Sequence, residues 1–178
     1  MENVRVSMRY AKALYPIADA EGKSEEVLSD LSKIVNLINT SADLRLLIHS
    51  PIITSLKKKR IFEEIFKDKI STITYNFLIL LVGKGRENMI KGIFYCFNNL
   101  YNQANNLIAC KIISAREMDS DARHRVVEFI EHHTKLRAVP EYLLDSNLLG
   151  GMKIKIDGWV YDATLQNKLK NLKRVLVK

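Results

Sequence analysis

Residues 83–86, Gly-Lys-Gly-Arg, resemble part of a phosphate-binding loop. A working loop of this kind follows a strand and reads G-x-x-x-x-G-K-[ST], so that a hydroxyl residue comes directly after the lysine. Here the surrounding residues have a helical period, and Gly85 follows the lysine instead. The stretch is more typical of a helix C-terminus that ends at a glycine.

Three of the four histidines fall within one predicted helix: His124, His132 and His133. A helical zinc site places two histidines at i and i+4, usually as H-E-x-x-H, with a further ligand elsewhere. That spacing is absent from this helix. We therefore expect His133 to lie in the core or at its edge rather than on a metal.

Other residue types that could do chemistry are also explained by structure. Three aspartates could be taken for a carboxylate cluster: Asp145, Asp157 and Asp162. Turn and helix-cap positions explain them more simply. Cys96 and Cys110 form no C-x-x-C pair, which argues against a disulfide scaffold, a zinc ribbon or a redox motif. The sequence therefore predicts no catalytic residue, no metal and no cofactor.

The chain of 178 residues has 28 basic and 20 acidic residues, a net charge of +8. Residues 1–106 and residues 107–178 each contribute +4, so the charge is not confined to a tail. Such a surface favours acidic partners, which include nucleic acid, anionic membranes and acidic proteins, although an ordinary solvated surface in a proteome rich in lysine, asparagine and isoleucine explains the charge more simply. The run Lys57 to Arg60 could contact phosphates, but Phe62 and Phe66 beside it have core spacing, and a solvated helix face explains the run better.

Residues 1–106 have a helical period and predict a bundle of six helices joined by short loops. Between residues 24 and 39, apolar residues recur at i, i+3, i+4 and i+7, and Ser24 is a plausible N-cap. The segment 71–83 is apolar on most sides, which is typical of a central bundle helix. Its run Phe77 to Val82 is far shorter than the about 20 apolar residues that a membrane span requires.

The first predicted helix covers about residues 6–20. Its apolar face has three larger residues with two alanines beside them: Tyr10, Leu14 and Ile17, then Ala11 and Ala18. Pro16 lies inside this helix, where a proline removes one hydrogen bond and costs about 3 kcal/mol. We therefore expect a kink at Pro16 or a helix break near Tyr15.

After Asn106 the helical period gives way to alternation, and residues 107–178 predict a small α+β unit. Met152 to Ile156 alternates apolar residues with lysines, and Asp157-Gly158 is the favoured two-residue turn of a β-hairpin. Pro140 cannot donate to a strand ladder, so its strand belongs at a sheet edge or starts there.

The chain ends in a predicted helix that Asp162 or Thr164 caps. Its leucines recur at helical spacing and are expected to face inward: Leu165, Leu169 and Leu172. Its later turns carry basic residues and no acid, and a helix dipole favours cations there.

Three stretches of the sequence resemble, in order, the delta subunit of F-type ATP synthases, the family of the mitochondrial oligomycin-sensitivity-conferring protein. Residues 148–173, LLGGMKIKIDGWVYDATLQNKLKNLK, resemble its C-terminal signature of a glycine pair, two strands, a cap and spaced leucines. Residues 9–23, RYAKALYPIADAEGK, resemble its N-terminal helix. Residues 80–90, LLVGKGRENMI, resemble its helix junction.

The resemblance implies a non-catalytic stator subunit. Residues 1–106 would grip the N-terminal helix of an α subunit of the catalytic head, and residues 107–178 would join the b subunits of the peripheral stalk, so that rotation is coupled to ATP synthesis and proton transport. The membrane would be reached only through the complex, at the cytoplasmic face of the bacterial inner membrane. The alternative is a basic, two-module nucleic-acid-binding protein, such as a transcription or ribosome factor, whose binding would fall steeply with salt.

The resemblance also directs the search for contact residues. On the family's first and fifth helices the candidates for the α-subunit contact are Tyr10, Ala11, Leu14, Ala18, Asn76, Phe77 and Leu80. Capture of a helix needs an apolar groove, and small residues would let the guest approach closely, although each apolar candidate also fits the bundle core. The candidates for the stalk contact are Gly150, Gly151, Leu169 and Leu172. The two glycines equally fit a tight backbone position.

Overall fold

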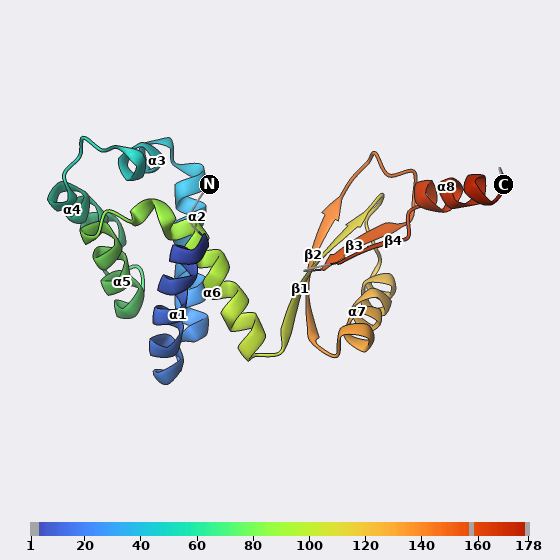
Figure 1. Cartoon of the computed structure of the whole chain (residues 1–178), viewed down its shortest axis with the longest axis horizontal. Helices are drawn as coiled ribbons and strands as arrows, with labels where there is room; N and C mark the ends of the chain where they lie inside the picture. The colour runs from blue at the N-terminus through green and yellow to red at the C-terminus, as the bar shows by residue number, and fades with distance from the viewer. Residues whose placement is uncertain (1–3, 157–158, 177–178) are drawn as a thin grey trace. The chain divides into compact units, whose positions relative to one another are not determined.

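The computed structural model describes residues 4–156 and 159–176, with side chains through residue 174. The chain divides into two compact units, Met1–Tyr101 and Asn102–Lys178. The first unit is helical, and the described part of the second contains a four-stranded sheet with helices (Figure 1). The predicted α+β class is confirmed.

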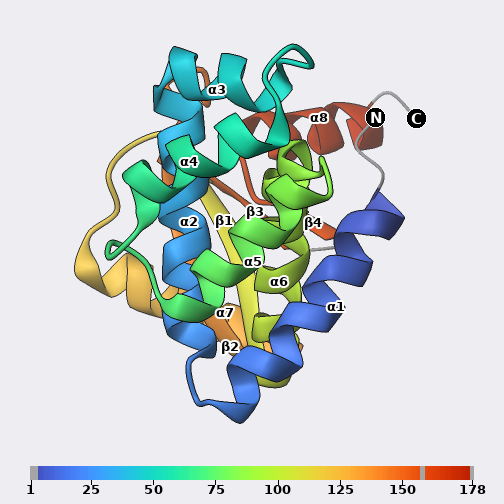
Figure 2. The same ribbon diagram turned by 90° about the vertical axis from the view of Figure 1, so that its left-hand side faces the viewer.

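The helices of the first unit are α1 (Val4–Ala20), α2 (Ser24–Thr40), α3 (Ala42–His49), α4 (Ser55–Phe66), α5 (Thr72–Gly83), the 3-10 helix η1 (Glu87–Met89) and α6 (Ile90–Ala104), whose last turn belongs to the second unit (Figures 1 and 2). The second unit continues with β1 (Leu107–Ser114), α7 (Ser120–Thr134), β2 (Arg137–Leu144), β3 (Met152–Ile156), β4 (Trp159–Asp162) and α8 (Leu165–Leu176).

The core of the first unit takes buried apolar side chains from every helix between α1 and α6, and Phe62 and Phe97 are fully buried in it. α4 packs against α5, and α2 packs against both α3 and α5. Asp30 of α2 is 3% exposed and accepts a hydrogen bond of 2.7 Å from the backbone N–H of Ser71. A carboxylate at a helix N-terminus is favoured by the dipole, so this contact fixes the start of α5 onto α2.

Pro16 does not end α1. The helix runs unbroken from Val4 to Ala20 with Pro16 inside it, so the predicted break near Tyr15 is wrong. The buried residues of α1 recur on both sides of the proline: Ser7, Ala11, Leu14 and Ala18. Their packing stabilises the helix across the one hydrogen bond that the proline removes. Ile17, expected on the inner face, is 55% exposed.

Glycine ends α5 as the sequence predicts. Gly85 follows the C-cap Lys84 and has a φ of 63°, a left-handed conformation that glycine adopts without strain. The N–H of Gly85 donates to the carbonyl of Val82, and the N–H of Arg86 donates to that of Leu81. These two bonds form a Schellman motif. Residues 83–86 are therefore a helix terminus and not a phosphate loop.

Side-chain caps begin α5 and α7. The side chain of Ser71 accepts a hydrogen bond at the start of α5, and that of Asp119 does so at the start of α7, where the bond is 2.6 Å long. Ser24 is different, because it is the first residue of α2 and is buried. The N-cap position is Lys23, whose side chain makes no capping bond.

The sheet of the second unit has the strand order β2-β1-β3-β4. β1 and β2 are parallel and are joined by the crossover helix α7, as parallel neighbours require. β3 and β4 pair antiparallel, which confirms the predicted hairpin, although its turn at Asp157-Gly158 lies outside the described residues. Pro140 lies in β2, an edge strand, as predicted.

α7 covers one face of this sheet. Its residues Val126 and Ile130 pack with alternate residues of β1 and β3 into a second small core: Cys110, Ile112, Ile154 and Ile156. The residues between them point to the opposite face, and Lys111 and Lys155 are exposed there. This is the one-sided pattern that the alternation of 152–156 predicts.

Candidate protein-binding surfaces

The side chains of α1 and α5 meet at an aromatic contact. The ring centroids of Tyr10 and Phe77 are 6.2 Å apart with planes at 70°, an edge-to-face arrangement. The guanidinium of Arg9 lies 6.0 Å from the Tyr10 centroid. Tyr10 and Phe77 are half-buried, whereas Asn76 and Leu80 on α5 are exposed, Leu80 by 49%. An apolar and partly aromatic surface of α1 and α5 is therefore accessible to solvent.

The other three candidates on α1 lie in the core. Ala11 and Ala18 are 0% exposed and Leu14 is 3% exposed. They line the contact between α1 and the rest of the first unit, because they belong to its core cluster. Small side chains therefore let α1 approach its own neighbours closely. Ile17, one residue before Ala18, is the exposed apolar residue on this helix turn.

A buried ion pair, which the sequence did not indicate, holds α4 to two other segments. The ammonium of Lys58 donates to the Glu87 carboxylate at 2.5 Å and to the carbonyl of Ile48, the penultimate residue of α3, at 3.1 Å. The two side chains are 7% and 6% exposed. Of the basic run, Lys57 and Arg60 are exposed as expected and Lys58 is not. The partners lie 29 positions apart, so no local pattern could have predicted the pair.

Three large apolar side chains on or next to the α3–α4 connection are exposed: Leu46 of α3, Ile52 of the connection and Leu56 of α4, at 70%, 89% and 76%. Leu46 also lines a shallow hollow of about 480 Å³. The hydrogen bond from Lys58 to the Ile48 carbonyl holds the end of α3 to α4, so it ties the two ends of this connection together.

The glycine pair shapes the entry to α8. Gly151 has a φ of 79°, and a side chain there would place its Cβ 2.4 Å from the carbonyl oxygen of Ala163. A Cβ on Gly150 would lie 2.7 Å from the side chain of Leu165, whose N–H donates to the Gly150 carbonyl at 3.0 Å. Gly151 is thus required by the close approach of the backbone that leads into α8, whereas Gly150 is favoured by its φ of 152°, because the exposed Leu165 side chain could move aside.

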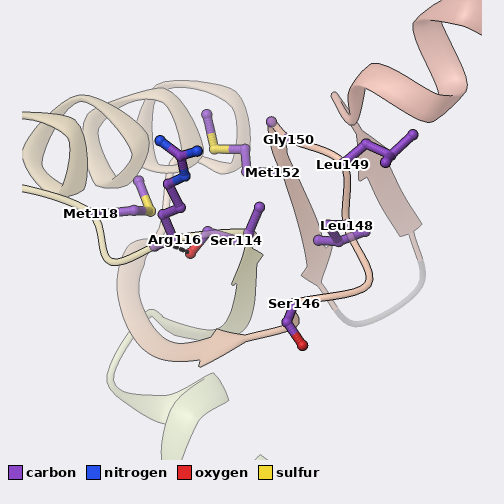
Figure 3. Close-up of a pocket in the computed structure, with 10 residues that line it drawn as sticks. Ser114, Arg116, Met118, Ser146, Leu148, Leu149, Gly150 and Met152 are labelled. Carbon is purple, nitrogen blue, oxygen red and sulfur yellow. Dashed lines mark hydrogen bonds between the residues drawn. The ribbon is translucent and has the colours of Figure 1, made fainter.

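The same two glycines line a hollow of about 570 Å³. Figure 3 shows Arg116, Met118 and Met152 on one side of it and Ser146 and Leu148 on the other. The hydroxyl of Ser114 is directed to the carbonyl of Arg116 at 2.8 Å and is therefore engaged within the chain. The hollow mixes one cation with apolar walls and holds no set of converging catalytic groups.

The leucines of α8 point into solvent. Leu165, Leu169 and Leu172 are 47%, 59% and 58% exposed, so the expectation that they face inward is wrong. Figure 1 shows the reason, because α8 extends beyond the end of β4 and not across the sheet. The stripe lies opposite basic residues, so α8 is an amphipathic helix without a partner among the described residues.

The first turn of α8 is capped as predicted. The Thr164 hydroxyl accepts from the N–H of Asn167 at 3.3 Å, and Asp162 accepts from the hydroxyl and N–H of Thr164 at 2.7 and 3.1 Å. These hydrogen bonds, and secondarily the nearby ammonium of Lys153, lower the pKa of Asp162. The helix therefore leaves the sheet from a defined, hydrogen-bonded corner.

No catalytic constellation appears in the described part of the chain. Burial raises the pKa of the Cys96 and Cys110 thiols, which makes them poor nucleophiles. His133 is exposed and stacks on Phe129 with centroids 4.2 Å apart, so its expected place in or near the core is wrong. Among the described residues, no three metal-ligating side chains gather at one point, and no helix is long and apolar enough to cross a membrane.

Comparison with known proteins decides what these surfaces belong to. A family model of the ATP synthase delta (OSCP) subunit matches residues 6–176. The chain belongs to this family. The delta (OSCP) subunit is a non-catalytic stator subunit of the F-type ATP synthase, and the nucleic-acid-binding alternative is not favoured.

Individual relatives agree with the family model. ATP synthase subunit delta of Clostridium botulinum strain Loch Maree is 31% identical over 170 residues, which cover 96% of this chain and 95% of that protein. ATP synthase subunit delta of Clostridium kluyveri is 29% identical over 96% of this chain and 94% of that protein. The delta-subunit relationship therefore extends over both units.

Solved structures share the fold. A chain of the Toxoplasma gondii mitochondrial ATP synthase hexamer has a TM-score of 0.74 at 19% identity and covers 97% of both chains. A chain of the Polytomella F-ATP synthase has a TM-score of 0.52 at 23% identity and covers 53% of this chain and 84% of that chain. At these identities the likeness shows a delta-subunit fold and not individual contacts.

Proposed function

We propose that this delta subunit links the catalytic head to the peripheral stalk, with one unit for each. In this proposal residues 1–106 form a six-helix bundle that holds the N-terminal helix of an α subunit, and residues 107–178 join the b subunits. The link keeps the head still while the rotor turns, which couples rotation to ATP synthesis and proton transport. The protein is then a peripheral component at the cytoplasmic face of the bacterial inner membrane.

The observation that carries the proposal is the exposed leucine stripe of α8. Three leucines at helical spacing, each about half exposed or more, form the apolar side of a helix whose contacts with the described part of its unit are confined to its first turn. A stripe of this kind is suited to packing against another helix. We assign the stalk contact to Leu169 and Leu172, while Gly150 and Gly151 contribute by fixing the direction in which α8 leaves the sheet.

For the head contact, the exposure of the side chains narrows the candidates. Tyr10, Phe77, Leu80 and Asn76 can reach a guest helix on α1 and α5, and Ile17 joins them because it is exposed one turn beyond Leu14. Ala11, Leu14 and Ala18 support this surface from beneath, as core residues. A guest helix with an apolar stripe would cover the rings of Tyr10 and Phe77 and the exposed aliphatic residues.

The stalk contact can be tested with the full chain and the extramembrane segment of the organism's own b subunit. Replacing both Leu169 and Leu172 by serine should weaken binding at least about tenfold, because truncation of central apolar contacts has effects of this size. The matched control replaces Lys170 and Asn171, exposed on the same helix, by serine. Equal affinities for the two double variants would remove α8 from the interface.

The head contact can be tested by calorimetry with a peptide that matches the N-terminus of the organism's α subunit. Ile17→Ser and Leu80→Ser should each weaken binding without changing the circular dichroism of the chain. Lys12→Ser, an exposed change elsewhere on α1, is the control. A peptide that binds both variants as tightly as the unchanged chain would contradict the assignment to α1 and α5.

A further inference from the structure

The face of the sheet that α7 covers is open at one edge. Four strands about 4.8 Å apart span roughly 14 Å between the outer two, whereas a helix with its side chains is about 10–12 Å across. α7 lies nearest to β2, at one end of the strand order, and its residues Val126 and Ile130 also cover Ile154 and Ile156 of β3. One helix in that position leaves β4, the strand at the other end, only partly covered.

Strand register identifies the residues of β4 that lie on this open edge. Ile154 is in the core beneath α7, and its cross-strand partner Tyr161 therefore points to the same face, as does Trp159 opposite Ile156. On the far strand, Tyr142 is covered by the guanidinium of Arg123, 5.0 Å from its ring centroid. In the described part of the chain no guanidinium lies over Tyr161 or Trp159; Tyr161 meets the ring of Phe129, and the two side chains are 45% and 38% exposed.

A hollow of about 290 Å³ runs between α7 and the open edge of the sheet at β4, and we call this hollow the seam. It is lined by Ala122, Arg125, Val126 and Phe129 of α7 and by Met152, Ile154, Tyr161 and Ala163. The ring centroids of Phe129 and Tyr161 are 5.3 Å apart and form its apolar wall. Arg125 is the one charged residue of the lining, and it makes no ion pair with any residue that the structure describes.

We infer that this seam is a seat for a second helix, which lies beside α7 along β4 and is supplied by the stalk partner. The guest presents an apolar stripe to Phe129, Tyr161 and Trp159 and carries acidic residues on the flank that meets Arg125. The inference rests on the proposed stalk function, and it adds where the partner lies and what charge it bears.

Other occupants fit less well. Only Ala163 and Thr164 separate β4 from α8, and the N–H of Leu165 is bonded to Gly150, so α8 could not turn back onto β4 without breaking its own corner. A second copy of the chain would bring together two molecules that each carry a net charge of +8. An acidic amphipathic helix satisfies both the shape of the seam and its charge.

Two neighbouring residues on β4 give a matched test, because they are both exposed and point to opposite faces. Tyr161→Ser should weaken binding of the b extramembrane segment to the full chain at least about tenfold, as loss of a central aromatic anchor does. Val160, which is 55% exposed, faces away from α7, so Val160→Ser should change the affinity less than about twofold. Similar effects of the two changes would overturn the seat.

Two further measurements separate this inference from the proposal beneath it. Trp159 is the only tryptophan of the chain, so its fluorescence should shift to the blue when a helix covers β4. If binding of the b segment is lost in the Leu169 and Leu172 double variant but is unaffected by Tyr161→Ser and leaves the fluorescence unchanged, the stalk function stands and the seat is refuted.

The charge of the guest is tested with two designed amphipathic peptides of identical leucine pattern, one flanked by glutamates and one by lysines. The glutamate peptide should bind the full chain more tightly, and Arg125→Glu should reverse the order. If the b segment fails to bind the unchanged chain, the stalk function fails, while binding of the glutamate peptide with a shift of Trp159 fluorescence would still support the seat. A lysine peptide that binds as well as its counterpart would refute the charge assignment.

Discussion

Removing one partner of the buried Lys58–Glu87 pair should destabilise the first unit severely. Lys58→Met keeps the length of the side chain but leaves the Glu87 carboxylate, 6% exposed, without its cation. One carboxylate oxygen, Oε2, already lacks a hydrogen-bond partner, so the charge would have little compensation. Breaking a buried ion pair from one side costs about 3–5 kcal/mol, a large part of the about 5–15 kcal/mol that holds a typical protein folded.

Replacing both partners should cost far less. In the Lys58→Met, Glu87→Leu double variant neither charge of the pair remains, and only the carbonyl of Ile48 loses its donor, at about 1–3 kcal/mol. Urea unfolding followed by far-ultraviolet circular dichroism gives the free energies, with Lys57→Met on the exposed side of α4 as the control. A single variant that costs under about 1 kcal/mol, or a double variant that is no better than Lys58→Met, would refute the buried-charge reasoning.

Three shorter predictions concern other features. Gly151→Ala should lower the unfolding free energy of the second unit by about 1–3 kcal/mol, because of its positive φ and the clash with the Ala163 carbonyl, and the Trp159 fluorescence transition in urea should show it. Leu14→Asp should unfold the first unit, whereas Ile17→Asp should leave its circular dichroism intact, because the first residue is core and the second is exposed. The folded structure lowers the pKa of Asp162 from 3.8, so this carboxylate should add stability above about pH 4, and that stability should be lost as the pH falls through the lowered pKa. Asp162→Asn should remove this part of the acid sensitivity, which urea unfolding at a series of pH values would measure.

The features that the sequence predicted correctly are those with a local cause. Gly85 ends α5 because the chain turns through a positive φ there, and Thr164 caps α8 because its hydroxyl reaches an N–H three residues on. Pro140 was confined to an edge strand by its missing N–H. In each case the physical reason acts within a few residues, so the sequence contains it in full.

The errors concern which side of an element is covered. On α1 the large residues suggested the inner face, yet Ala11 and Ala18 are buried and Ile17 is not, because close helix packing selects small residues that hydrophobicity alone does not mark. The leucines of α8 have perfect helical spacing, but spacing cannot say whether a chain supplies the covering surface itself. Lys58 and Glu87 meet only through tertiary structure, across 29 positions.

The exposed apolar side chains of α8 and β4 leave stabilisation that the isolated chain does not use. Burying a leucine fully contributes about 1.5–3 kcal/mol, and here Leu169 and Leu172 are more than half exposed, while Tyr161 on β4 is 45% exposed. A partner that covers them would gain this free energy, and its binding would show a negative heat-capacity change. Its dependence on salt would be much weaker than that of phosphate binding, because only the flank of the guest that meets Arg125 is charged. A nucleic acid held by the basic residues alone would lose affinity steeply with salt. A calorimetric titration at two temperatures and two salt concentrations therefore distinguishes capture of a helix from binding of phosphates on this surface.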